Sequence, residues 1–127
     1  LWFAKQLVSE GIIEDPVMIQ MCMGIPWGAP DDLNTFMSMV NNTPENWTFS
    51  AFSIGQHQMS YVAAAMLAGG NLRVGLEDNL WLSRGQLATN AQLVEKAATI
   101  ATNMGATLMG PAEVREKMQL VKRAPRV

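Results

Sequence analysis

The sequence predicts an α/β fold in which parallel strands alternate with helices. Three observations support this prediction: strand-length apolar or β-branched runs at 17–23, 47–54 and 72–76, helical apolar spacings between them, and short connections. Strands joined through helices run parallel, because each crossover returns the chain to the same end of the sheet. Three strands are too few for a closed barrel. The composition therefore leaves open a small open α/β layer or three strands of a larger barrel.

In the first half of the chain, glycine and proline separate two predicted helices and two predicted strands. Residues 1–10 mix apolar with polar residues and stop before a glycine, as the last turns of an amphipathic helix do. The apolar run 17–23 is typical of a strand buried on both faces, and a glycine-rich loop follows it. Helical apolar spacing predicts a second helix over 33–40, and β-branched and aromatic residues predict a second strand over 47–54.

The second half predicts three helices and one short strand. An alanine-rich apolar segment at 59–67 predicts a helix that packs closely against a sheet, and two glycines end it. Residues 72–76 predict a short strand, after which a polar loop leads to a helix over 93–104. Pro111 stands at a first-turn position and starts a final helix that runs through Met118.

The composition excludes several classes of partner. The chain of 127 residues is 49% apolar and 16% charged, too hydrophobic for disorder and suggestive of neighbouring segments that cover part of it. Its 9 basic and 11 acidic residues give a net charge of −2, which provides no broad cationic field for nucleic acid or anionic lipid. We therefore expect neither nucleic acid nor a membrane as partner. The basic residues Lys122, Arg123 and Arg126 are interpreted as a solvated tail.

One cysteine bears on the compartment. Cys22 cannot form an internal disulfide, and the apolar residues around it predict a buried thiol in a reducing compartment, which favours the cytoplasm. No segment approaches the roughly 20 apolar residues of a membrane span, and the start lacks the order of a signal peptide. The start also lacks an initiator Met, so we expect the chain to begin inside a longer protein.

The segment 71–79 carries the most chemical information. Strand alternation would place Arg73, Gly75 and Glu77 on one face, with Gly75 leaving room for the long arginine side chain. Arginine and glutamate would then lie about 13 Å apart along the strand. Charges on an inward strand face are costly unless they are paired or bind a cation. The pattern therefore favours a functional site over a structural ion pair.

Two adjacent acids, Glu77 and Asp78, stand at the predicted carboxyl end of this strand, the edge where α/β barrels and open parallel sheets assemble their sites. Adjacent acids leaving a strand point to different sides, so one could bind a metal while the other acts on substrate. The alternative, that Asp78 caps a loop or the next helix, stays open. His57 has no histidine or cysteine partner at a metal-site spacing, so we interpret it as a loop or cap residue rather than a ligand.

The run 70–85 resembles the signature of the β-keto acid cleavage enzymes, the family of 3-keto-5-aminohexanoate cleavage enzyme. Residues 110–116 are similar to the closing Pro-Ala-Glu-x-Arg-Glu helix of that family, and the segments 23–28 and 52–55 agree with it as well. The resemblance covers essentially all of the chain, and the first motif is highly specific.

The resemblance implies a (β/α)₈ barrel, of which residues 1–127 would form the C-terminal part, strands six to eight, with the N-terminal half absent. It implies a zinc ion held by a His-x-His pair outside this chain and by Glu77. Family members condense a β-keto acid with acetyl-CoA and release acetoacetate and an acyl-CoA. The matching Arg73 and Asp78 would bind and deprotonate the keto acid, and the resemblance suggests a homo-oligomer.

The chain departs from the family pattern at Gln56, where the family often has arginine, which leaves the acyl chain of the substrate open. By itself the chain is expected to be inactive. Two alternatives stay open: a non-catalytic half-barrel that only supports assembly, and another metal-dependent barrel enzyme such as an aldolase, which would share Glu77 but not need acetyl-CoA.

Overall fold

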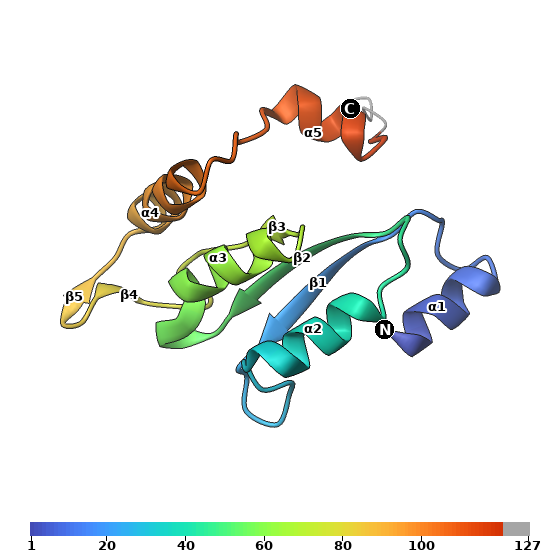
Figure 1. Ribbon diagram of the computed structural model, residues 1–127, viewed down its shortest axis with the longest axis horizontal. Coiled ribbons are helices and arrows are strands. Elements are labelled where there is room, and N and C mark those ends of the chain that lie inside the picture. Colours follow the sequence, from blue (N-terminus) through green and yellow to red (C-terminus); the bar gives the residue numbers. More distant parts are fainter. Residues whose placement is uncertain (121–127) are drawn as a thin grey trace, which may run out of the picture.

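The computed structural model describes residues 1–120 and is built on a three-stranded parallel sheet in the order β1-β2-β3 (Figure 1). The strands are β1 (Met18–Met23), β2 (Thr48–Ser53) and β3 (Asn71–Leu72). Both strand pairs are parallel, which confirms the predicted α/β class with parallel strands. The basic residues beyond 120 that were interpreted as a tail lie outside the described residues.

Five helices connect and follow the strands. They are α1 (Trp2–Ser9), α2 (Leu33–Asn41), α3 (Gln58–Leu67), α4 (Asn90–Asn103) and α5 (Pro111–Lys117), and a 3-10 turn, η1 (Gly55–His57), precedes α3. Each predicted helix is confirmed, with bounds that differ by a few residues. The Thr89 side chain caps α4 and forms a capping box with Gln92, so α4 begins a few residues before its predicted start.

The prediction of a polar loop after residue 76 is wrong in part. An antiparallel hairpin of β4 (Trp81–Ser83) and β5 (Gln86–Leu87) lies within that segment. Gly85 adopts a φ of 80° in the turn between these strands, a conformation that glycine reaches without steric cost. Strands of two and three residues carry no readable alternation in the sequence, which is why this hairpin was not predicted.

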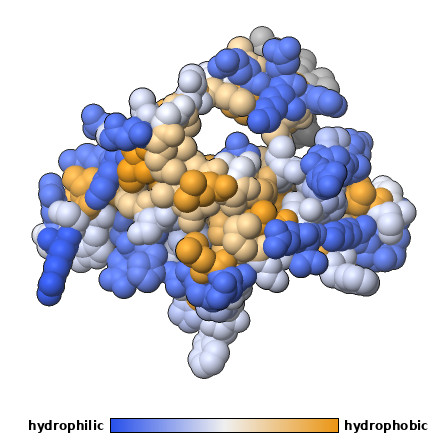
Figure 2. All heavy atoms as spheres, viewed as in Figure 1, coloured by the Kyte–Doolittle hydropathy of each residue, from blue (hydrophilic) through white to orange (hydrophobic). Residues whose placement is uncertain are grey.

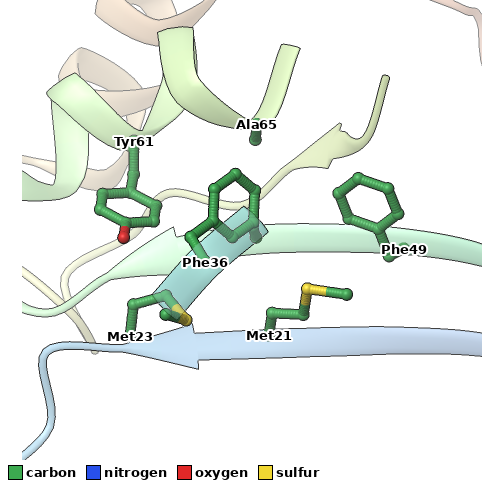
Figure 3. Packing of buried hydrophobic residues seen from close by; sticks show 7 residues of the cluster. Met21, Met23, Phe36, Phe49, Tyr61 and Ala65 are labelled. Atoms are coloured by element: carbon green, nitrogen blue, oxygen red, sulfur yellow. The ribbon is translucent and has the colours of Figure 1, made fainter. Parts of the chain in front are cut away.

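The hydrophobic core lies between the sheet and the helices α2 and α3, which cover one of its faces. Figure 3 shows Phe36 between Tyr61 and Phe49, and the ring centroids lie 5.5 Å and 6.3 Å from that of Phe36 in edge-on arrangements. Met21 and Met23 of β1 pack against this cluster from the sheet. Edge-on aromatic pairs stabilise a core beyond their burial alone. Helix α4 in turn packs against α3 through its buried residues.

The second face of the sheet carries a more polar set of side chains. Alternation along β1 buries Met21 and Met23 on the helical side, whereas Gln20 is exposed and Cys22 is half-buried. The prediction that 17–23 is buried on both faces is therefore wrong within the described residues, because the packed helices α2 and α3 cover one face of the sheet. Cys22 is correspondingly less buried than predicted.

Apolar side chains also remain on the outer surface. Figure 2 shows hydrophobic residues gathered across the middle of the displayed face, with hydrophilic residues around them. Helix α1 has no buried residue, and its Trp2 and Phe3 side chains are exposed. Of the helices within residues 1–120, none has both the length and the apolar character needed to cross a bilayer.

Candidate active site

The candidate site begins where β3 ends. The structure pairs only Asn71 and Leu72 with β2, so the strand predicted over 72–76 was too long. The chain turns instead, because the amides of Asp78 and Asn79 both donate to the carbonyl of Gly75 at 3.2 Å. Arg73 therefore follows the strand directly, and Glu77 and Asp78 lie in the turn.

Arg73 and Asp78 form a two-point ion pair. The Nε atom of Arg73 lies 3.1 Å from Oδ2 of Asp78, and its Nη2 atom lies 3.2 Å from Oδ1. The Asp78 side chain is only 4% exposed, against 36% for Arg73. A buried carboxylate needs such a partner, since leaving it unpaired is costly. The site thus has a buried acid and a cation with one side open to solvent.

Two further residues hold the Arg73 guanidinium on the second face of the sheet. Nη1 donates to the side-chain oxygen of Gln20 at 2.8 Å, and Cζ lies 4.1 Å from the ring centroid of Phe52. Neither Gln20 nor Phe52 was predicted as a site residue from the sequence. Strand alternation could have revealed them. It places Gln20 in β1 and Phe52 in β2 on the same face of the sheet as Cys22 and Ser50.

Glu77 does not share a strand face with Arg73, so that prediction was wrong. Its exposed side chain bends back over Gly75, and the space left by the missing side chain of Gly75 is taken by the Glu77 carboxylate rather than by the arginine. The two adjacent acids differ in exposure, since Asp78 is buried and Glu77 is exposed, although they lie in a turn rather than at the end of a strand. Asp78 does not cap α4, because Thr89 does.

The turn that carries both acids is held from two helices. The buried Gln58 side chain of α3 donates to the carbonyl of Gly75 at 3.0 Å. The Asn90 side chain, at the start of α4, accepts from the amide of Leu76 at 2.9 Å. The amide of Gly55 donates to the carbonyl of Asp78 at 2.6 Å, which ties the turn to the end of β2. Hydrogen bonds to three separate elements limit the movement of Asp78.

A second polar cluster lies beyond the ends of β1 and β2. Nδ1 of His57 lies 2.5 Å from Oδ2 of Asp31, and the Ser53 hydroxyl donates to the same oxygen at 2.8 Å. The hydrogen bonds from His57 and then Ser53 hold the pKa of the Asp31 carboxyl below its ordinary value. His57 ends η1 and stands at the N-cap position of α3 without a side-chain cap bond, so of the two predicted alternatives, a loop or a cap residue, it takes the cap position.

Cys22 faces the ion pair from β1. Burial raises the pKa of the Cys22 thiol, the negative charge of Asp78 raises it further, and the Arg73 guanidinium partly opposes both effects. A thiol with a raised pKa stays protonated near neutral pH and is a poor nucleophile. Cys22 is therefore part of the wall of the site rather than a candidate nucleophile.

The described residues supply part of a metal-binding set. Residues 1–120 contain no group of three or more His, Cys, Asp or Glu side chains that could hold a metal ion. Glu77 nevertheless fits the role of a single ligand: its carboxylate is exposed, and within residues 1–120 it takes part in no side-chain hydrogen bond or ion pair. Carboxylate oxygen is an ordinary ligand of zinc. A complete site would need its other donors from outside these residues.

These features define an α/β protein with a polar site at the carboxyl edge of a parallel sheet, where proteins of this class assemble their active sites. The chain belongs to the beta-keto acid cleavage enzyme family, whose model matches residues 1–120. The resemblance of the sequence to that family is thereby confirmed.

The chain is also similar to several named proteins. The chain is 73% identical over 123 residues to the 3-dehydrocarnitine:acetyl-CoA trimethylamine transferase of Rhizobium meliloti (strain 1021), covering 97% of this chain and 41% of that protein. It is 32% identical over 121 residues to the 3-keto-5-aminohexanoate cleavage enzyme of Fusobacterium nucleatum subsp. nucleatum. That match covers 94% of this chain and 44% of that protein. It is 29% identical over 125 residues to the 3,5-dioxohexanoate:acetyl-CoA acetone transferase of Paraburkholderia graminis. That match covers 94% of this chain and 40% of that protein. The chain thus spans less than half the length of these relatives.

Proposed function

We propose that this chain is the C-terminal part of a zinc-dependent enzyme that condenses a β-keto acid with acetyl-CoA and releases acetoacetate and an acyl-CoA. The Arg73–Asp78 ion pair carries the proposal, because it joins a buried acid and a partly open cation at the carboxyl edge of the sheet. The relatives named for acetyl-CoA transfer support acetyl-CoA as the co-substrate.

We propose a (β/α)₈ barrel for the whole protein, with β1, β2 and β3 as strands six to eight. The strands are parallel, and the helices α2 and α3 pack on one face only. The opposite face, with Gln20, Cys22 and Arg73, would then line the barrel interior. Coverage of 41% to 44% of two relatives fits a chain that supplies fewer than half of eight strand–helix units.

Arg73 is proposed to bind the carboxylate of the keto acid. Its Nε, Nη1 and Nη2 atoms each donate one hydrogen bond to Asp78 or Gln20, and the two terminal nitrogens keep further N–H donors. Because the guanidinium is partly exposed, those donors can reach a ligand. Charge-assisted bonds of this kind orient a carboxylate strongly.

Asp78 is proposed as the base that removes a proton from the carbon between the keto and carboxylate groups. Each of its oxygens accepts one hydrogen bond from Arg73 and keeps an unused acceptor position. Its fixed position in the turn favours proton transfer, since a base must be held within hydrogen-bond reach of the proton. Arg73 would balance the charges of Asp78 and of the substrate carboxylate.

Glu77 is proposed as one zinc ligand, with the His-x-His pair implied by the family resemblance supplied from the preceding part of the protein. A zinc ion bound there would polarise the keto oxygen of the substrate. Glu77 and Asp78 would then act on neighbouring atoms of one substrate, because they are consecutive residues with opposite exposure.

The substrate is proposed to be a β-keto acid with a cationic acyl end, of which 3-dehydrocarnitine is the first to test. The 73% identical relative is named for that compound. Gln56, in the 3-10 turn η1 after β2, is neutral where the family often has arginine, so the choice of acyl end is tested on a panel of substrates.

The decisive experiment uses the complete reading frame that contains this chain, purified with zinc. Acetoacetate release is measured from a panel of β-keto acids with acetyl-CoA, including 3-dehydrocarnitine. Release that requires acetyl-CoA supports the proposal, and no release from any member with zinc confirmed bound rejects it. The same assay separates both alternatives, because a half-barrel remnant would release nothing and an aldolase would not need acetyl-CoA.

The cytoplasm and a homo-oligomeric state belong to the same proposal. The single cysteine suits a reducing compartment. Exposed apolar side chains on α1, among them Trp2 and Phe3, offer surface for the rest of the barrel or for a second subunit. Light scattering of the full-length protein would measure the oligomeric state directly.

A further inference from the structure

A cavity of about 880 Å³ opens beside the candidate active site. Its walls come from the loop after β2, the start of α3, the β4–β5 hairpin and α4. In Figure 1 the hairpin lies at the end of the molecule toward which the arrows of β1 and β2 point. The cavity therefore lies at the same carboxyl edge as Arg73 and Asp78, within the size range of small-molecule sites.

The cavity is joined to the ion pair through the backbone. Asn79 lines it and directly follows Asp78, and Gly55, another wall residue, donates its amide to the carbonyl of Asp78 at 2.6 Å. From Asn79 the wall continues along the hairpin to Arg84 at its turn. An elongated ligand could thus run from the ion pair to the hairpin turn.

The charge of the cavity favours an anion. Arg84 and Lys96 line it, and none of its wall residues is acidic. Lys96 donates to the carbonyl of Leu82 at 2.6 Å, and within residues 1–120 neither cation forms a salt bridge. Glu95 is the acid that adjoins Lys96 in sequence, and it lines a separate depression that Lys96 also borders. Two cations without a carboxylate partner leave their charge available to a ligand.

The remaining wall is apolar and aromatic. Met59 and Leu82 contribute apolar surface, and the Trp81 side chain, from a residue that is 49% exposed, offers an indole face. Nucleotide bases stack on such faces. Cations together with an exposed aromatic ring therefore fit a phosphorylated nucleotide better than a simple carboxylate.

We propose that this cavity binds the phosphorylated nucleotide end of the CoA thioester, with Lys96 and Arg84 on the phosphates and Trp81 on the adenine. The inference rests on the proposed function, in which acetyl-CoA is the co-substrate. The loops after β2 and β3 form this cavity, and if these strands are the last two of a barrel, they occupy the region where barrels frequently bind phosphate. The pantetheine arm would extend past Asn79 toward Asp78.

The test uses the full-length enzyme and the variants Arg84→Gln, Lys96→Gln and Trp81→Leu. Lys117→Gln is the matched control, because Lys117 is a lysine of α5 that lines a different depression, beside the start of β3. Binding of adenosine 3′,5′-bisphosphate is measured by calorimetry, and steady-state kinetics compare acetyl-CoA with S-acetylpantetheine, which has no nucleotide. Melting temperatures show whether each variant is folded.

Each cation removed should weaken nucleotide binding and raise KM for acetyl-CoA by about tenfold or more, because a charge-assisted hydrogen bond is lost. KM for the keto acid, and kinetics with S-acetylpantetheine, should stay near the wild-type values. The Lys96 side chain bonds the hairpin at Leu82, so Lys96→Gln could disturb it. In that case Arg84→Gln serves as the second variant, because the Arg84 side chain has no hydrogen bond within residues 1–120.

The outcomes separate the two proposals. If the wild-type protein turns over acetyl-CoA and both cation variants bind the nucleotide as tightly as the wild type does, the inference about the cavity is overturned. An equal loss with S-acetylpantetheine would also overturn it, because that loss would point to damage near the reacting thioester. Nucleotide binding that depends on Arg84 and Lys96 without any turnover would reject the proposed function and leave the cavity assignment standing.

Discussion

Asp78 receives a hydrogen bond on each carboxylate oxygen from a single arginine, with Nε and Nη2 of Arg73 at 3.1 Å and 3.2 Å. This two-point contact sets both the position and the plane of the buried acid. It also leaves Nη1 of Arg73 directed to Gln20, so one guanidinium links the turn after β3 to the face of β1.

Arg73→Met should destabilise the protein by about 2 kcal/mol, because the buried Asp78 loses its partner. The loss should be smaller than at a fully buried pair, since the Arg73 side chain is 36% exposed. Arg73→Lys keeps the charge but not the planar two-point contact, so it should retain more stability and still lower kcat/KM by at least about tenfold. Urea unfolding and steady-state kinetics check both variants. Wild-type stability and turnover in Arg73→Met would show that the ion pair has no role.

Glu77→Gln and Asp78→Asn should separate metal binding from proton transfer. Glu77→Gln should lower zinc affinity by more than about tenfold, because it removes the proposed anionic ligand. Asp78→Asn should keep zinc and lower kcat by about a hundredfold or more, because the proposed base is lost. Metal content by elemental analysis and turnover are measured on both variants. If Asp78→Asn loses zinc while Glu77→Gln retains it, the two roles are assigned the wrong way round.

Gly75→Ala should weaken zinc binding without breaking the ion pair. An added Cβ at Gly75 would meet the Glu77 carboxylate, so the glutamate would have to move. The Gly110→Ala control adds the same atom where the nearest neighbour, Glu113, lies 3.5 Å away, an ordinary contact. Zinc titration of both variants tests the prediction. Unchanged zinc affinity in Gly75→Ala would mean that the position of Glu77 over Gly75 does not matter for the metal.

The Asp31–His57 contact should appear in the acid titration. The pKa of Asp31 is lowered in the folded protein, so its stabilising contribution is full above the ordinary value of about 3.9 and is lost as the pH falls through the folded value. His57→Ala removes the largest cause of this shift, so the pKa of Asp31 should rise toward its ordinary value. Carboxyl NMR titration measures the change. An Asp31 pKa that is the same with and without His57 would contradict this account.

Much of the fold could be predicted from sequence because helices and longer strands carry local periodicity. The core positions Met21, Phe36 and Phe49 fall in segments whose apolar spacing indicated a strand, a helix and a strand. The β4–β5 hairpin could not be predicted in this way, because its strands are too short for alternation. Gln20 lies on the sheet face that the packed helices leave uncovered. Its exposure could not be inferred, because the sequence does not say which sheet face the helices cover.

By itself, the sequence determined the α/β class, the helices, and the presence of one arginine and two adjacent acids in the segment of the last predicted strand and its carboxyl end. These features depend on residues close together along the chain. The tertiary structure alone decided that Arg73 pairs with Asp78 and not with Glu77. That choice depends on where β3 stops, and hydrogen bonds with Gly55, Gln58 and Asn90 hold the turn that follows it. Contacts between residues distant in sequence set the final geometry, because local spacing cannot specify which elements meet.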